Sequence, residues 1–232
     1  MRIKVNDMGS LNITPFIVSL KLALTTTFML FVIAFPVACM FAFYRFRCKF
    51  VLEQILTLPI IMPPTVLGFY ILMAFSPDSI LGNIIIGYMG IDVLFTFKGI
   101  VVASCIATFP FMLLPLKNGL LSVDKSLIEA SYTLGKTKLE TMLKVIIPCI
   151  IPYIISGPVT TFAHTIGGFG VVLMTGGNIP GVTKVASIEI YELVEGMNYG
   201  AAHIYSIILL AISVAVISML NWLNKSEAKK II

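Results

Sequence analysis

Long stretches without formal charge constrain this chain more than any other feature. Residues 22–44, 54–77, 99–116, 145–183 and 196–224 contain no Asp, Glu, Lys or Arg. A helix needs about 20 mostly apolar residues to cross a bilayer. Only 12% of the 232 residues are charged and 58% are hydrophobic, whereas a soluble domain carries about 25% charged residues. We therefore expect an all-α integral membrane protein, which excludes a cytosolic enzyme and a disordered chain.

Four of these stretches each fit one membrane span, and the stretch at residues 145–183 needs a separate interpretation. It is too long for one helix and too short for two helices with an ordinary turn. We expect a fourth span over about residues 139–165, followed by a glycine-rich hairpin or a partial re-entrant segment. The prediction is a single transmembrane domain over residues 1–232 with five spans.

A sixth span would require one of two short apolar segments to enter the membrane. The segment at residues 80–91 is too short to cross by itself and is expected at the interface or as a partial helix. The segment at residues 166–181 is the other candidate. Between the fourth and fifth spans, residues 184–195 are amphipathic and mostly acidic.

The basic residues predict which side of the membrane each loop occupies. The net charge is +5, and basic residues of membrane proteins gather on cytoplasmic loops, so this charge does not indicate nucleic-acid binding. With five spans, 11 of the 16 basic residues fall on one side. We therefore expect a multi-pass protein of the inner (cytoplasmic) membrane, in contact with membrane lipid, with its N-terminus outside and its C-terminus cytoplasmic. The 11 residues are Arg45, Arg47, Lys49, Lys117, Lys125, Lys136, Lys138, Lys144, Lys225, Lys229 and Lys230.

The sequence has no pattern typical of a metal site or a catalytic site. The four cysteines form no CxxC pair and have no histidine at zinc-ligand spacing. Three of them lie in apolar runs, where they are expected to be small buried hydrophobic residues: Cys39, Cys105 and Cys149. No HExxH or GxSxG motif is present. The glycines at 176–181 lack the Lys-Ser/Thr pair of a phosphate loop, so we expect no catalytic residue, no metal, no cofactor and no bound ATP on this chain.

The cytoplasmic segment 122–140 carries signals for a short helix, a turn and a second helix. Ser126 and Glu129 fit a capping box, and Thr137 and Glu140 fit another. Gly135 stands where a glycine ends a helix. Four residues fall on one stripe of the first helix: Leu127, Ala130, Ser131 and Leu134. Such a short helix is marginal alone, so it packs either on this protein's own helices or on a cytoplasmic partner.

The same segment resembles the EAA signature of ABC-transporter permeases, which favours the partner. The signature is Glu-Ala-Ala, three residues, Gly, nine residues, Ile, any residue, Leu-Pro. Its spacing matches throughout, with Ser131, Val145 and Ile147 as conservative departures. In that family the short helix is the coupling helix and seats on a partner ATPase, which binds the ATP. The resemblance assigns ATPase coupling to Glu129, Ala130, Ser131, Gly135, Val145, Ile147 and Pro148.

Two further segments narrow the resemblance to molybdate permeases. Residues 58–68 read LPIIMPPTVLG and resemble the LPLVLPPTVLG stretch of that family, and Phe169-Gly170 with residues 177–181 resemble its GEFG…GNIPG stretch. The likeness extends over nearly the whole chain. Gly168 stands where the family usually has Glu, and His164 where it often has Arg, which leaves the role of these two positions open.

The resemblance implies an ABC importer permease fold of the MetI-like type. It also implies a homodimer, a cytoplasmic ABC ATPase dimer and an extracytoplasmic oxyanion-binding protein, together importing molybdate. Tungstate and sulfate permeases remain alternatives, because these residues do not separate oxyanions of the same shape and charge. A free-standing secondary transporter or channel is the alternative of another class, although such proteins usually carry intramembrane carboxylates, which the predicted spans lack.

Two groups of residues are candidates for the transport pathway. Pro63-Pro64 breaks the second span, because two backbone donors are missing, and the result is either a packing kink or a pathway-lining bend at which Thr65 offers a hydroxyl. His164 is the only titratable residue in the middle of its uncharged stretch, and intramembrane ionisable residues are candidate functional sites. It is either a neutral histidine bonded to a backbone carbonyl or part of the pathway, with Thr160, Thr161 and Thr165 as hydroxyl donors to an oxyanion.

Overall fold

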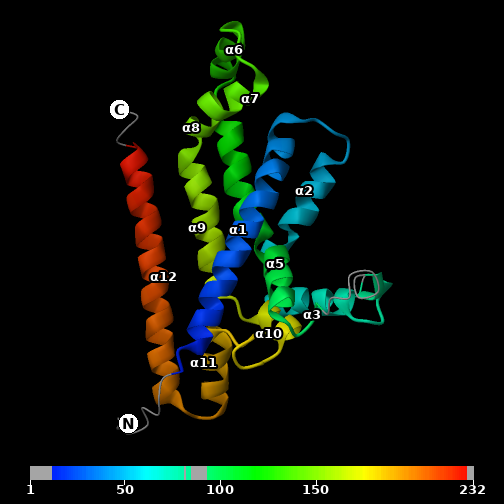
Figure 1. The fold of residues 1–232 in the computed structure, drawn as a ribbon, viewed down its shortest axis with the longest axis vertical. Helices are drawn as coiled ribbons and strands as arrows, with labels where there is room; N and C mark the ends of the chain where they lie inside the picture. Colours follow the sequence, from blue (N-terminus) through cyan, green and yellow to red (C-terminus); the bar gives the residue numbers. More distant parts are fainter. Residues whose placement is uncertain (1–11, 81, 85–92, 229–232) are drawn as a thin grey trace.

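The structure, a computed structural model, describes residues 12–80, 82–84 and 93–228, and the side chains up to residue 218. Long helices lie side by side along the molecule (Figure 1). They are α1 (Thr14–Phe43), α5 (Phe97–Ser122), α9 (Ile151–Ile166) and α12 (Tyr199–Ala228). Helix α5 packs against both α1 and α9, α1 also contacts α9, and α12 covers α9.

Shorter elements occupy the two ends of this bundle. At the upper end in Figure 1 are α6 (Lys125–Thr133), α7 (Lys138–Thr141), the π-helix η3 (Met142–Ile146) and α8 (Ile147–Cys149). At the lower end are α10 (Gly170–Gly176) and α11 (Ala186–Glu195). The second predicted span consists of α2 (Lys49–Thr57), the 3₁₀ helix η2 (Leu58–Ile60) and α3 (Pro64–Phe75).

The helices confirm the all-α membrane prediction. Within the described residues, three helices are long and apolar enough to cross a bilayer, Thr14–Phe43, Phe97–Ser122 and Tyr199–Ser218. Two bent pairs raise the number to five if each pair is one span. The seven residues of α10 are too few to cross as a sixth. The other candidate, residues 80–91, lies largely outside the described residues.

The second and fourth spans are both bent; the break at Pro63-Pro64 in the second span was predicted, whereas the bend in the fourth span was not. The segments Lys49–Ile60 and Pro64–Phe75 meet at 115°, and Figure 1 shows α3 turned across the bundle. Pro63 precedes α3 with an extended ψ of 133°, because a proline disfavours helical geometry in the residue before it. The fourth span bends by 70° between Lys138–Cys149 and Ile151–Ile166.

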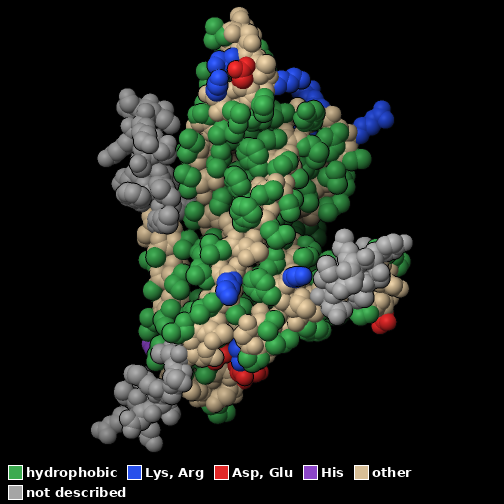
Figure 2. All heavy atoms as spheres, in the orientation of Figure 1, with side chains coloured by type: hydrophobic (Ala, Val, Ile, Leu, Met, Phe, Trp, Pro, Cys, Tyr) green, Lys and Arg blue, Asp and Glu red, His purple; other side chains and the backbone are tan. Residues whose placement is uncertain are grey.

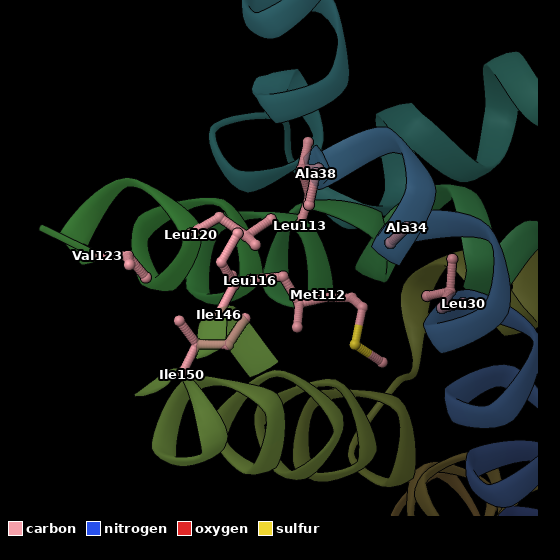
Figure 3. Packing of buried hydrophobic residues seen from close by; sticks show 10 residues of the cluster. All are labelled: Leu30, Ala34, Ala38, Met112, Leu113, Leu116, Leu120, Val123, Ile146 and Ile150. Carbon is pink, nitrogen blue, oxygen red and sulfur yellow. The ribbon is translucent and has the colours of Figure 1, made fainter. Parts of the chain in front are cut away.

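A hydrophobic core joins α1, α5 and the segment around the second bend (Figure 3). Leu30, Ala34 and Ala38 face Met112, Leu113 and Leu116, and Ile146 and Ile150 close the cluster from the other side. Small residues let helices approach closely in a membrane. A Cβ atom added at Gly157 of α9 would come within 3.2 Å of the Met112 Sδ atom, so α9 and α5 are in backbone-level contact.

The surface is that of a protein in lipid. Hydrophobic side chains cover the sides of the bundle, and Lys and Arg gather around α6 and the turn between α1 and α2 (Figure 2). Cys39 and Cys105 pack against the core as predicted. Cys149 is exposed, contrary to prediction, because α8 sits at the bend and packs mainly on η3.

Candidate functional site

Hydrogen bonds between residues close in the sequence hold the tip formed by α6 and α7. The N-cap of α6 is Asp124, whose carboxylate accepts a hydrogen bond from the Ser126 N–H at 2.9 Å, so the prediction of Ser126 as N-cap was wrong. Asp124 has the extended backbone that a cap requires, whereas Ser126 is already inside the helix. The bonds from Ser126 hold the pKa of the Asp124 carboxyl below its ordinary value.

The turn after α6 follows the sequence prediction. Gly135 has a φ of +76°, its N–H donates to the Tyr132 carbonyl, and the Lys136 N–H donates to the Ser131 carbonyl. These two bonds form a Schellman motif, which needs a left-handed residue at the glycine position. The Thr137–Glu140 capping box is also present, and its hydrogen bonds lower the pKa of Glu140. The chain thus makes a fixed elbow between α6 and α7.

The residues of the predicted stripe on α6 differ in their exposure to solvent. Leu127 is 47% exposed and Leu134 78% exposed, and Ala130 and Glu129 are exposed too. Ser131 is buried, and its hydroxyl lies 2.9 Å from that of Thr141. Val145 and Ile147 are half-buried and Pro148 is exposed. Of the residues assigned to coupling, Glu129 and Ala130 therefore lie on an exposed face of α6. Ser131 instead connects α6 to α7 through its hydrogen bond with Thr141.

A cavity of about 490 Å³ lies between α3, α5, α10 and the end of α9. It is lined mostly by apolar atoms, and His164 is the one ionisable side chain among the described residues that line it. The lining includes four of the six predicted pathway residues, Pro64, Thr65, His164 and Thr165. Pro63 and Thr161 are not among the lining residues, and Thr161 is fully buried.

The threonines around His164 do not offer free hydroxyl protons. Thr161 donates to the Gly157 carbonyl and Thr165 to the Thr161 carbonyl, each at 2.8 Å, and Thr160 donates among carbonyls that include Phe111 at 3.0 Å. The predicted role of these hydroxyls as donors to an oxyanion is therefore wrong in this arrangement, because threonine in a helix readily bonds to the preceding turn. His164 is exposed, and the centroid of its ring lies 3.8 Å from the centroid of the Phe111 ring.

Comparison with known proteins identifies the class. The family model for the binding-protein-dependent transport system inner membrane component matches residues 34–229. The chain belongs to this family. The permease is 37% identical over 204 residues to the molybdenum transport system permease protein ModB of Azotobacter vinelandii, covering 88% of each chain. It is 29% identical to a probable sulfate transport system permease protein cysT of Helicosporidium sp. subsp. Simulium jonesii, covering 88% of this chain and 76% of that one.

A solved structure supports the fold. The MetNI methionine ABC transporter in inward-facing conformations matches with a TM-score of 0.72 and 17% identity, covering 93% of this chain and 95% of that one. The predicted permease fold of the MetI-like type is confirmed.

Sequence analysis missed part of the permease's cavity lining and the ion pairs that hold the loop at residues 177–185. Ser104 and Thr108 of α5 line the cavity, and their i, i+4 spacing in an otherwise apolar span was the available signal. Lys184 is only 12% exposed and forms ion pairs with Glu189, at 3.2 Å, and with Glu192. Glu189 and Glu192 belong to the amphipathic, mostly acidic segment 184–195, and both bind this lysine. Burial opposes the lysine charge, but these two carboxylates together raise the pKa of Lys184.

Proposed function

We propose that this permease is the membrane subunit of an ATP-driven importer for molybdate. The support for the substrate is the 37% identity, over most of both chains, to a permease named for molybdenum transport. The more distant sulfate relative keeps sulfate as the second candidate, and tungstate shares the chemistry of molybdate. A free-standing transporter or channel is disfavoured by the family, which is described as binding-protein-dependent.

The observation that carries the coupling role is the open face of α6. Leu127, Ala130 and Leu134 lie on the outside of a helix that projects past the bundle (Figure 1). Exposed apolar side chains on a capped and rigid helix are suited to fill a groove on a partner protein. We assign that groove to a cytoplasmic ATPase, which supplies the ATP site that this chain is not expected to have. This assignment places α6, and the C-terminal end of α12, on the cytoplasmic side.

The assembly proposed around the permease is a homodimer with two ATPase subunits and an extracytoplasmic oxyanion-binding protein. The pathway runs through the region of the cavity, where the bend before Pro64 brings Thr65 to the wall that His164 also lines. The described residues of its wall include no Asp, Glu, Lys or Arg. An anion would therefore be held weakly there, which suits release to the other side.

Reconstitution tests the function directly. The permease is purified with its ATPase, placed in liposomes with the binding protein and ATP, and uptake of molybdate, tungstate and sulfate is measured separately. ATP-dependent uptake of molybdate is expected to exceed that of sulfate. Preferred uptake of sulfate would change the substrate, and anion movement without any ATPase would overturn the proposal.

A second experiment tests the coupling helix. Glu129→Lys and Gly135→Trp are expected to reduce ATP-driven uptake while membrane insertion stays normal, since both positions are exposed and neither supports the core. Ser122→Ala, at the end of α5, serves as the control. Normal uptake in both variants would remove the coupling role from this segment.

A further inference from the structure

One pair of buried hydroxyls connects the projecting helix α6 to the rest of the chain. The Oγ atom of Ser131 lies 2.9 Å from the Oγ1 atom of Thr141. Ser131 is 4% exposed and Thr141 is fully buried. Within the part of the chain whose side chains are described, this is the one side-chain hydrogen bond given between α6 and the elements that follow it.

The position of α6 makes this bond important. Helix α6 packs mainly against α7 and η3, and Ile128 touches the core only at its edge. The backbone link between Ser131 and Thr141 is the Gly135 elbow, held by its own turn bonds. The elbow fixes the local direction of the chain, whereas the Ser131–Thr141 bond closes the angle between the two helices. Together they make α6, α7 and the start of η3 one rigid unit.

The element beyond Thr141 is suited to receive a displacement. Residues 142–146 form a π-helix, a geometry that is rare and occurs most often at functional sites. Its last residue, Ile146, is buried in the core beside Ile150. The 70° bend into α9 follows directly, and α9 carries the cavity-lining residues His164 and Thr165. A path of packed elements therefore leads from α6 to the cavity, with Thr141 at its entrance.

We propose that the Ser131–Thr141 hydrogen bond is a positioning contact that makes α6 and η3 move together, so that motion of the ATPase reaches α9. This inference rests on the proposed coupling function of α6. Neither residue touches the transported ion, and both act through η3. Without the bond, α6 stays folded and seated on its partner, because Asp124, Gly135 and the Thr137–Glu140 box are unaffected. Its movement then bends the elbow instead of displacing α9.

The test measures transport and ATP hydrolysis in the same liposomes. Ser131→Ala and Thr141→Val each remove one hydroxyl and leave the side-chain volume nearly unchanged. We expect uptake per ATP hydrolysed to fall about 3- to 10-fold, the factor that corresponds to one net hydrogen bond, with the ATPase rate and the amount of co-purified ATPase unchanged. Thr141→Ser, which keeps the hydroxyl, is expected to retain wild-type coupling.

A double-variant cycle separates the bond from two independent packing effects. If the bond is the cause of the coupling, the double variant Ser131→Ala with Thr141→Val lowers the uptake per ATP hydrolysed no further than either change alone. Ser122→Ala is the control, because it removes a serine hydroxyl near this end of the bundle that donates to the Gly119 carbonyl of its own helix at 2.8 Å and so joins no two helices. It should leave the ratio unchanged.

The outcomes distinguish this inference from the function on which it rests. Absence of ATP-driven uptake in the unaltered permease would refute the proposed function. Normal uptake in the unaltered permease, with an unchanged ratio in the hydroxyl-free variants or a loss equal to that of Thr141→Ser, would overturn the positioning role alone. Additive losses in the double variant would also overturn it.

Discussion

Gly170 lies so close to Pro64 that a Cβ atom added at position 170 would come within 3.1 Å of the Pro64 Cβ atom. A Cβ atom at Gly68 would likewise lie 2.9 Å from the Met174 Cβ atom and 3.0 Å from the Val171 Cα atom. Helices α3 and α10, far apart in the sequence, therefore meet at a seam of two glycines. This seam holds the transverse helix α3 beside the cavity.

The seam predicts a clear stability effect. Gly68→Ala should lower the free energy of unfolding by about 1–3 kcal/mol, because the new methyl group overpacks against backbone atoms. Thermal unfolding of the purified permease in detergent measures the change. Gly167→Ala is the control, since its nearest atom would be 3.8 Å away. Equal melting temperatures for the two variants would contradict the close packing of α3 against α10 at Gly68.

The exposed end of α6 predicts a partner-specific loss. Leu134 is 78% exposed, so Leu134→Asp should leave the fold intact and reduce co-purification of the ATPase at least about tenfold, as expected for a buried interface anchor. Leu134→Met keeps an apolar side chain and should bind normally. ATPase capture by the aspartate variant at the wild-type level would show that this leucine faces no partner.

The turn at Gly135 predicts a backbone effect without a steric one. No atom lies within 4 Å of a Cβ added there, but the φ angle is +76°. Gly135→Ala should cost about 1–2 kcal/mol of local stability, because left-handed geometry disfavours a Cβ atom, and Gly135→Asn should cost less. Hydrogen exchange at the Gly135 and Lys136 amides reports the difference. Identical exchange in the two variants would argue against strain as the cause.

The cavity wall predicts opposite results for two neighbouring residues. His164→Leu removes the one ionisable group among the described wall residues and should reduce molybdate uptake in liposomes. Thr165→Val should keep the uptake rate within about twofold, because its hydroxyl proton is already donated inside the helix. A larger loss in the valine variant than in the leucine variant would reverse the assignment of the pathway.

The ion pairs of Lys184 predict a pH response in the loop at residues 177–183. Bonds from Lys184, and then from Asn178, lower the pKa of Glu192 from its ordinary value of 4.5. A carboxyl with a lowered pKa in the folded state stabilises above its unfolded pKa, and that contribution is lost as pH falls through the folded pKa. Limited proteolysis of residues 177–183 should therefore stay slow from pH 7 to below pH 4.5 and then accelerate. Lys184→Met should remove this dependence. Acceleration between pH 7 and 5 in the unaltered protein would contradict it.

Local chemistry explains what the sequence could predict. The spans follow from apolar length, the break at Pro63-Pro64 from missing donors, and the Gly135 turn and the Thr137–Glu140 box from short-range hydrogen bonds. The first cap was assigned to Ser126 instead of Asp124 because both lie within a few residues and either side chain can accept the bond.

The remaining features depend on contacts between distant segments. The 115° angle of α3 is set by packing against α10 at Gly68 and Gly170, and no local pattern gives its direction. Likewise, the Ser131–Thr141 bond joins two helices whose relative angle is fixed only after the Gly135 elbow and the core around Ile146 are formed. The apolar stripe predicted which residues of α6 share a face, but it did not predict whether that face would be exposed or buried.

The helical segments Lys138–Cys149 and Ile151–Ile166 meet at a bend of 70°. A force applied along the first segment would therefore displace the second segment in a direction nearly perpendicular to the force. A thrust directed along the first segment would thus emerge as a sideways swing of α9. Such a swing widens or narrows a passage without moving any helix through the lipid, and so avoids transferring polar backbone or charged loops across the bilayer.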